Sequence, residues 1–152
     1  MAELHIKYWN VRHIRLPPNY GQSASLLAGI SCAYGDIIVT MDADLQNDPS
    51  DIPLLLNRLE ESDMVIGWRH CRNDPVVKKM SSFIANYFRN IVTGENIHDI
   101  GCSLKAFRKE VAESFYAFKG MHRFLPTLAA MHGFCVLERS EEHTSELQSR
   151  QS

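Results

Sequence analysis

An apolar run over residues 37–41, I-I-V-T-M, ends directly on two carboxylates, Asp42 and Asp44. A run this short and this apolar is typical of a strand that is buried on both faces of a sheet. A helical pattern precedes it over residues 21–33, and a helix start at residues 48–50, D-P-S, follows it. Strands that alternate with helices predict an α/β fold, an open sheet flanked by helices.

The same alternation continues through the rest of the chain. Further strands are expected at residues 14–16, 64–67, 103–107 and 134–137. The helix that opens at residue 48 includes Leu59, and further helices are expected at residues 78–92, 109–115 and 125–132. No internal repeat or low-complexity linker interrupts the pattern, so the sequence predicts one domain.

Composition excludes several classes of protein. The 152 residues carry a formal net charge of -2 and no basic stripe, which argues against a nucleic-acid binder. No stretch approaches the roughly 18 apolar residues of a membrane helix. The wide spacing of the four cysteines argues against a zinc site or a disulfide framework and favours reduced, cytoplasmic thiols: Cys32, Cys71, Cys102 and Cys135.

The two carboxylates after the apolar run are candidate metal ligands. They follow the carboxyl end of a strand, which is where open α/β sheets bind ligands. Mg²⁺ in proteins commonly takes one or two carboxylates together with phosphate oxygens of a substrate. We therefore expect Asp42, Asp44 and Gln46 to hold Mg²⁺ or Mn²⁺ against a nucleotide diphosphate. An acidic pair that merely caps the next turn is the structural alternative.

The surrounding residues resemble a known family. The stretches that carry the resemblance are N-Y-G-Q-S-A-S-L-L-A-G-I (residues 19–30), G-D-I-I-V-T-M-D-A-D-L-Q-N-D-P-S-D-I (35–52), V-I-G-W-R (65–69), N-D-P (73–75), T-G (93–94), I-H-D (97–99), G-C-S-L-K (101–105) and G-M-H-R-F (120–124). In order and spacing they resemble glycosyltransferase family 2 enzymes with the GT-A fold. The chain looks most like the polyprenyl-phosphate glycosyltransferases, which are relatives of dolichol-phosphate mannose synthase.

The resemblance implies an incomplete GT-A, Rossmann-like open sheet and an enzyme of cell-envelope biosynthesis. Such an enzyme moves a sugar from a UDP- or GDP-linked donor to a polyprenyl phosphate, with metal dependence and inversion at the sugar. It works at the cytoplasmic face of a membrane. The sugar, the nucleotide, the metal and the oligomeric state are left open.

The resemblance also assigns roles to residues. Asp99 matches the catalytic aspartate, although a largely dianionic acceptor phosphate needs little proton removal, so Asp99 could instead position the acceptor. Three cationic residues would contact the donor or acceptor phosphates: Arg69, Lys105 and Arg123. The sugar pocket would be formed by small residues and a histidine: Gly101, Cys102, Ser103 and His122.

One departure from the family and one rival class of enzyme leave alternatives open. Residues 1–10 do not match the family's opening strand and its P-x-Y-N-E loop, so an inactive, truncated nucleotide-sugar binder is one alternative. A phosphotransferase of the haloacid dehalogenase type also places D-x-D after an apolar strand, with Asp42 as nucleophile. That class usually has Thr or Val where this chain has Gln46.

The last residues do not follow the α/β pattern. Residues 139–149, R-S-E-E-H-T-S-E-L-Q-S, resemble the translation of a widely used sequencing adapter. We therefore expect residues 1–138 to form a partial GT-A catalytic domain. Residues 139–152 would be a non-native tail that packs nowhere on it. A native, exposed polar tail is the alternative.

Overall fold

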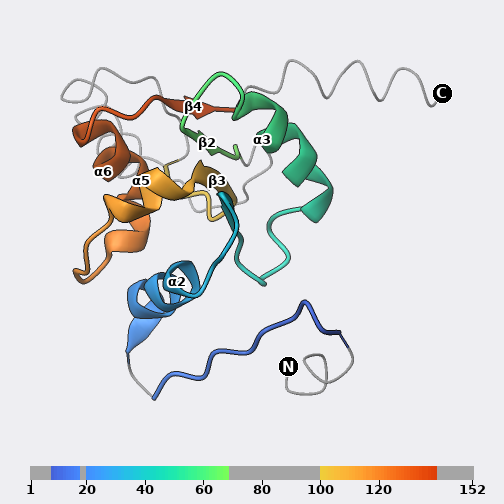
Figure 1. Cartoon of the computed structure of the whole chain (residues 1–152), viewed down its shortest axis with the longest axis vertical. Coiled ribbons are helices and arrows are strands. Elements are labelled where there is room, and N and C mark those ends of the chain that lie inside the picture. Colours follow the sequence, from blue (N-terminus) through green and yellow to red (C-terminus); the bar gives the residue numbers. More distant parts are fainter. Residues whose placement is uncertain (1–7, 18–19, 69–99, 140–152) are drawn as a thin grey trace, which may run out of the picture.

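The computed structural model describes residues 8–17, 20–68 and 100–139. Within them, four strands form one open sheet (Figure 1). The strands, in their order across the sheet, are β1 (Ile37–Thr40), β3 (Lys105–Arg108), β2 (Met64–Ile66) and β4 (Val136–Glu138). The predicted α/β class, an open sheet flanked by helices, is confirmed.

The strand β3 lies between β1 and β2 and runs antiparallel to both of them. Phe107 pairs with Ile38 on one side and with Met64 on the other. The strands β2 and β4 are parallel, with Met64 opposite Val136. Phe107 is fully buried, and its ring meets that of Phe115 edge to face at 5.4 Å between centroids. The core of the protein is therefore centred on β3, whose direction the sequence analysis did not predict.

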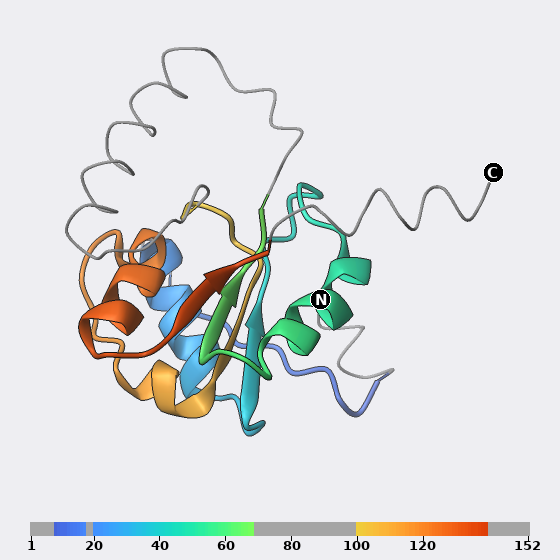
Figure 2. The same ribbon diagram turned by 90° about the horizontal axis from the view of Figure 1, so that it is seen from above.

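Helices cover both faces of this sheet. The helix α3 (Ile52–Arg58) packs on β2 and β3 from one side, whereas α5 (Lys109–Glu113) and α6 (Leu125–Met131) lie on the other side (Figures 1 and 2). The helix α2 (Gly21–Ser31) contacts the short 3-10 helix η2 (Met121–Arg123). A second 3-10 helix, η1 (Pro49–Asp51), leads into α3.

The start of the η1–α3 segment follows its sequence signals. The carboxylate of Asp48 accepts a hydrogen bond from the backbone nitrogen of Ser50 at 2.9 Å, and Pro49 occupies the first helical position. Both features are typical of helix starts, because they satisfy or remove backbone donors that have no partner inside the helix. Leu55 and Leu59 are buried against the sheet. The predicted start of this helix at residue 48 is confirmed.

Two predictions about strands are wrong. Residues 14–16 do not form a strand, because so short a run finds no pairing partner in the described structure and Pro17 cannot donate to a ladder. The strand β1 is not buried on both faces: Ile38 is buried, but 43% of Ile37 is exposed. Within the described sheet, β1 is an edge strand that pairs with β3 alone.

The other expected elements agree with the structure to within about two residues at most ends, which is the usual scatter of helix and strand boundaries. The helix expected at residues 78–92 lies outside the described residues. No helix in the described part of the chain is both long and apolar enough to cross a membrane.

The expectation that the tail makes no contact is wrong for its first residue. The backbone nitrogen of Arg139 donates to the carbonyl oxygen of Ile66 at 2.9 Å and so extends the pairing of β4 with β2. The Arg139 guanidinium lies 2.6 Å from the carboxylate of Asp51. Residues 140–152 lie outside the described residues, and their non-native origin stays a prediction.

The predicted non-native origin of residues 140–152 implies that they add no packing, so their deletion is expected to leave the melting temperature unchanged. Replacement of Arg139 by Ala removes the ion pair with Asp51 and is expected to cost up to about 1 kcal/mol of unfolding free energy. Thermal unfolding followed by circular dichroism compares the three chains. A larger loss on deletion than in Arg139→Ala would show that the tail packs on the body.

Candidate active site

A cavity of about 240 Å³ opens at the carboxyl end of β1. Its walls come from the first turns of α2, the end of β1, the segment that leads into β3, and η2. Six of the residues predicted from the sequence line it: Asp42, Gly101, Ser103, Lys105, His122 and Arg123. The fold thus brings together candidate residues that are up to 81 positions apart in the chain.

The other predicted residues lie elsewhere. Asp44 and Gln46 are exposed in the loop after Asp42, and neither belongs to the cavity lining. Cys102 is buried beneath the cavity, where a Cβ atom added to Gly67 would lie 3.3 Å from its sulfur. Arg69 and Asp99 lie outside the described residues.

Asp42 is half-buried, and its carboxylate has one amide partner. Nε2 of Gln22 lies 3.3 Å from both Oδ1 and Oδ2. The backbone nitrogen of Asp42 donates to the hydroxyl oxygen of Ser103 at 3.2 Å, and Nδ2 of Asn47 donates to the same oxygen at 2.8 Å. Ser103 therefore ties both ends of the loop at residues 42–47 to the segment that leads into β3.

The turn that follows Asp44 is closed by the side chain of Asp44 itself. The backbone nitrogen of Gln46 donates to Oδ1 of Asp44 at 3.2 Å, which closes a local turn. Leu45, inside this turn, has a φ of 63°, a conformation that non-glycine residues adopt at an energetic cost, and 95% of it is exposed. Such strain persists only where the surrounding contacts fix the loop, as the bonds of Ser103 do here.

Two cationic residues, Lys105 and Arg123, line the same cavity as Asp42. Lys105 is 2% exposed, and its ammonium donates to the carbonyl oxygen of Cys102. A buried ammonium is costly unless anions or hydrogen-bond acceptors surround it. Burial, reinforced by the charges of Arg123 and Lys105 and opposed by Asp42, lowers the pKa of His122 below its ordinary value of 6.5. The imidazole is therefore neutral at neutral pH.

Three polar residues of the site were not predicted from the sequence: Gln22, Ser23 and Asn47. Ser23 contacts His122, with its hydroxyl oxygen 3.0 Å from Nδ1. All three lie in stretches that carried the family resemblance, N-Y-G-Q-S and L-Q-N-D. That resemblance was the available signal, because helical periodicity alone counts Gln22 and Ser23 as ordinary residues of a first turn.

The donor atoms here fit a hard divalent cation that is shared with a substrate. The described residues contain no group of three His, Cys, Asp or Glu side chains that could enclose a metal. They offer two carboxylates and an amide oxygen on the loop at residues 42–46, and these are oxygen donors suited to Mg²⁺ or Mn²⁺. Phosphate oxygens of a ligand would have to complete the coordination.

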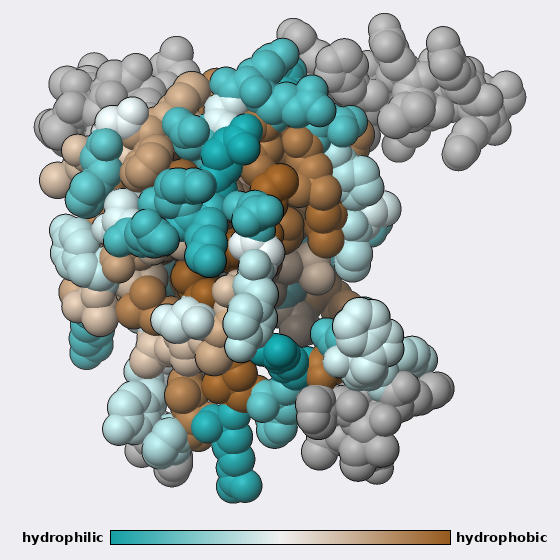
Figure 3. Space-filling model, in the orientation of Figure 1, coloured by the Kyte–Doolittle hydropathy of each residue, from teal (hydrophilic) through white to brown (hydrophobic). Residues whose placement is uncertain are grey.

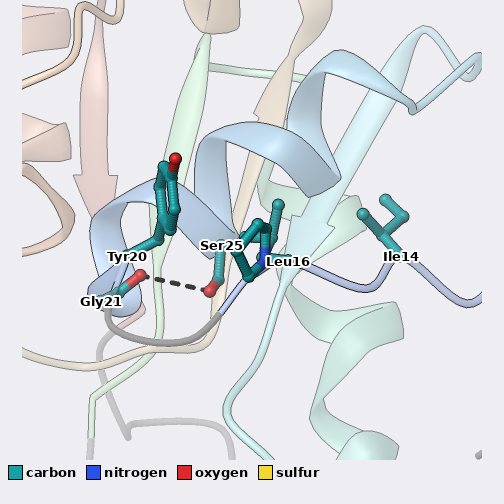
Figure 4. A pocket seen from close by; sticks show the side chains of 6 residues that line it. Ile14, Leu16, Tyr20, Gly21 and Ser25 are labelled. Carbon is teal, nitrogen blue, oxygen red and sulfur yellow. Dashed lines mark hydrogen bonds between the residues drawn. The ribbon is translucent and has the colours of Figure 1, made fainter.

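A second cavity, of about 330 Å³, lies between the N-terminal segment and α2 (Figure 4). Ile14, Leu16 and Tyr20 line it, and the hydroxyl of Ser25 donates to the carbonyl oxygen of Gly21 at 3.2 Å. None of the described residues that line it is charged. Figure 3 shows one face of the molecule, on which hydrophobic residues (brown) are exposed between hydrophilic ones (teal). The described lining of this cavity therefore offers no carboxylate, imidazole or thiol for acid–base chemistry or metal binding.

Comparison with known sequences identifies relatives. The family model described as glycosyl transferase family 2 matches residues 1–115. Dodecaprenyl-phosphate galacturonate synthase of Rhizobium johnstonii is 44% identical over 123 residues, which cover 79% of this chain and 36% of the relative. Undecaprenyl-phosphate 4-deoxy-4-formamido-L-arabinose transferase of Pseudomonas paraeruginosa is 38% identical over 130 residues, which cover 85% of this chain and 36% of the relative. The chain thus spans about a third of the length of these curated relatives.

Solved structures show the same fold. Glucosyl-3-phosphoglycerate synthase of Mycobacterium tuberculosis, in complex with Mn²⁺, uridine-diphosphate-glucose and phosphoglyceric acid, matches with a TM-score of 0.58 and 20% identity. The match covers 90% of this chain and 53% of that one. The same protein in complex with uridine-diphosphate matches with a TM-score of 0.56 and 20% identity, over the same shares of the two chains.

The pKa of His122 should respond in opposite directions to the loss of a positive neighbour and the loss of a negative one. Arg123→Gln removes a neighbouring positive charge and is expected to raise this pKa, whereas Asp42→Asn removes a carboxylate and is expected to lower it further. Lys109→Gln, an exposed change on α5, serves as the control. An NMR titration of the His122 ring measures all three. Equal shifts in Arg123→Gln and Lys109→Gln would contradict the described cavity.

Proposed function

Because the chain belongs to glycosyl transferase family 2, we propose that it forms part of the catalytic domain of an enzyme that transfers a sugar from a nucleotide sugar to a polyprenyl phosphate. The names of the relatives, a dodecaprenyl-phosphate and an undecaprenyl-phosphate transferase, support the acceptor class. A structural neighbour that holds uridine-diphosphate-glucose supports the donor class. The family match decides against the haloacid dehalogenase alternative.

The observation that carries this proposal is the cavity that is lined by Asp42 together with Lys105 and Arg123. A diphosphate needs cationic partners on one side, and arginine suits phosphate because its planar fork binds two oxygens at once. The carboxylate of Asp42 would repel the diphosphate unless a cation lay between them. A cavity lined by both a carboxylate and cationic groups therefore favours a metal-bound nucleotide diphosphate over an uncharged ligand.

The proposed reaction is a single displacement with inversion. An oxygen of the acceptor phosphate attacks the anomeric carbon, and the bond from that carbon to the diphosphate breaks as the new bond forms. Because the acceptor phosphate is largely dianionic at neutral pH, the step needs little help from a base. Positioning and electrostatic stabilisation then supply most of the rate. We propose that Asp99 and Arg69 orient the acceptor, with Asp99 as the catalytic residue.

The metal ligands proposed for this enzyme are Asp42, Asp44 and Gln46. Bound there, Mg²⁺ or Mn²⁺ would offset the negative charge that develops on the departing nucleoside diphosphate. The chain's own contribution is to hold the ligands in place. Gln22 and Ser103 fix Asp42 through its carboxylate and its backbone, and the turn closed by Gln46 fixes Asp44.

The acceptor places the complete enzyme at a membrane, and nucleotide sugars place its catalytic domain on the cytoplasmic side. We propose residues 1–138 as the part of that domain present here and residues 139–152 as non-native sequence. Since the chain spans about a third of its relatives, we expect it to contain the diphosphate cavity without being sufficient for transfer.

The test compares this chain with the protein encoded by its extended reading frame. Each is assayed with nucleotide sugars and a short-chain polyprenyl phosphate, with and without Mn²⁺. Transfer is expected only in the extended protein, and Asp44→Ala is expected to lower it by about 100-fold or more, because a metal ligand is lost. Asp48→Asn is the matched control, because its carboxylate serves only to cap η1.

Three outcomes would count against the proposal. Full activity in Asp44→Ala would refute the metal ligation. If the 152-residue chain transferred sugar as fast as the extended protein, the expectation that transfer needs further segments would be refuted. An extended protein that transfers no sugar from any donor would overturn the glycosyltransferase assignment itself.

A further inference from the structure

Ser23, in the first turn of α2, links this helix to η2 through two hydrogen bonds. Its hydroxyl oxygen accepts from the backbone nitrogen of Gly120 at 3.2 Å and lies 3.0 Å from Nδ1 of His122. Gly120 has a φ of 89°, in the left-handed region that favours glycine, and it directs the chain into η2. Ser23 thus contacts a site residue 99 positions away in the sequence.

The hydrogen atoms at this link can be assigned by elimination. A serine hydroxyl has one hydrogen to donate and two lone pairs to accept with. The backbone N–H of Gly120 occupies one lone pair. Within the described residues, Nδ1 of His122 is the one acceptor that the structure gives to the hydroxyl hydrogen. If Nδ1 carried the hydrogen instead, Ser23 would accept twice and its own hydrogen would lack a partner in a part-buried position.

The neutral ring therefore carries its hydrogen on Nε2. His122 lines the cavity, and with Nδ1 bonded to Ser23, the Nε2–H is the polar group of the ring that remains for a ligand. Lys105 and Arg123 present donors to the same cavity. An anionic oxygen is attracted by all three groups, whereas the opposite tautomer would turn a lone pair toward it. The lowered pKa of His122 supports a neutral ring at this place.

We propose that Ser23 is a positioning residue that fixes His122 as the Nε2–H tautomer, so that the ring donates to an anionic phosphate oxygen of the nucleotide sugar. The identity of the ligand rests on the function proposed above, whereas the tautomer does not. A histidine held in this way adds a hydrogen-bond donor without adding a third positive charge beside Lys105 and Arg123.

Long-range proton–nitrogen NMR of the isotopically labelled chain tests the tautomer directly. In the unmodified chain at neutral pH, we expect Nε2 to carry the hydrogen and Nδ1 to carry none. In Ser23→Ala the ring should lose this preference and populate both tautomers, and Ser23→Thr, which keeps the hydroxyl, should restore it. Ser25→Ala is the matched control, because Ser25 lies on the same helix and lines the same cavity but bonds to Gly21.

A hydrogen on Nδ1 in the unmodified chain would overturn the proposal, and so would an unchanged tautomer in a folded Ser23→Ala. Should Ser23→Ala fail to fold, the spectrum of the unmodified chain still decides. A purely structural role would lower the stability of Ser23→Ala and leave the tautomer as it was.

A kinetic comparison in the extended protein tests the consequence for the ligand. Ser23→Ala is expected to raise KM for the nucleotide sugar about 10-fold, the size expected for loss of one hydrogen bond to a charged group, with a smaller effect on kcat. Ser23→Thr should recover most of this loss. Unchanged KM in a variant whose tautomer is lost would contradict the contact with the donor. If the unmodified extended protein transfers no sugar while the tautomer is as expected, the proposed function fails and the assignment of the tautomer stands.

Discussion

The antiparallel insertion of β3 between β1 and β2 is the constraint on which the site depends. The register pairs Thr40, at the end of β1, with Lys105, at the start of β3. Because the two strands run in opposite directions, the residues that follow β1 and those that precede β3 meet at one edge of the sheet. A parallel β3 would place Lys105 at the far edge, about 10 Å or more from Asp42 for a strand of four residues. The presence of Asp42 and the buried Lys105 in one cavity is thus a consequence of strand direction.

This constraint also explains why the segment at residues 101–103 consists of small residues. The hydroxyl of Ser103 accepts from both ends of the loop at residues 42–47, and its carbonyl oxygen accepts from Thr40 at 3.0 Å. Cys102 fills the narrow space against Gly67, where even a Cβ atom would be tight. Larger side chains here would push β1 away from β3. They would thereby move the carboxylate of Asp42 away from Lys105 and Arg123. The segment therefore shapes the site chiefly through its backbone and its packing.

Sequence patterns predicted the elements better than they predicted their environment. Asp48 and Pro49 fixed the start of a helix because capping is a local interaction, readable from neighbouring residues. The direction of β3 was not readable, since side-chain alternation is the same for parallel and antiparallel neighbours. The exposure of Ile37 was missed for a related reason. An apolar run predicts a strand covered by neighbours on both sides, and the sequence does not show that β1 lies at the edge of the described sheet. Gln22 and Ser23 were missed because their partners, Asp42 and His122, are 20 and 99 residues away.

The charges in the cavity determine what its histidine can do. Lys105 is buried and Arg123 is adjacent to His122 in sequence, so a protonated imidazole would be a third cation in a space that already desolvates its groups. Asp42 favours the protonated form, yet burial and the two cations outweigh it, and the pKa of His122 falls. Among the described residues that line the cavity, Lys105 and Arg123 are cationic and Asp42 is anionic. A neutral ring held by Ser23 adds a hydrogen-bond donor for an anionic ligand and adds no further positive charge beside Lys105 and Arg123.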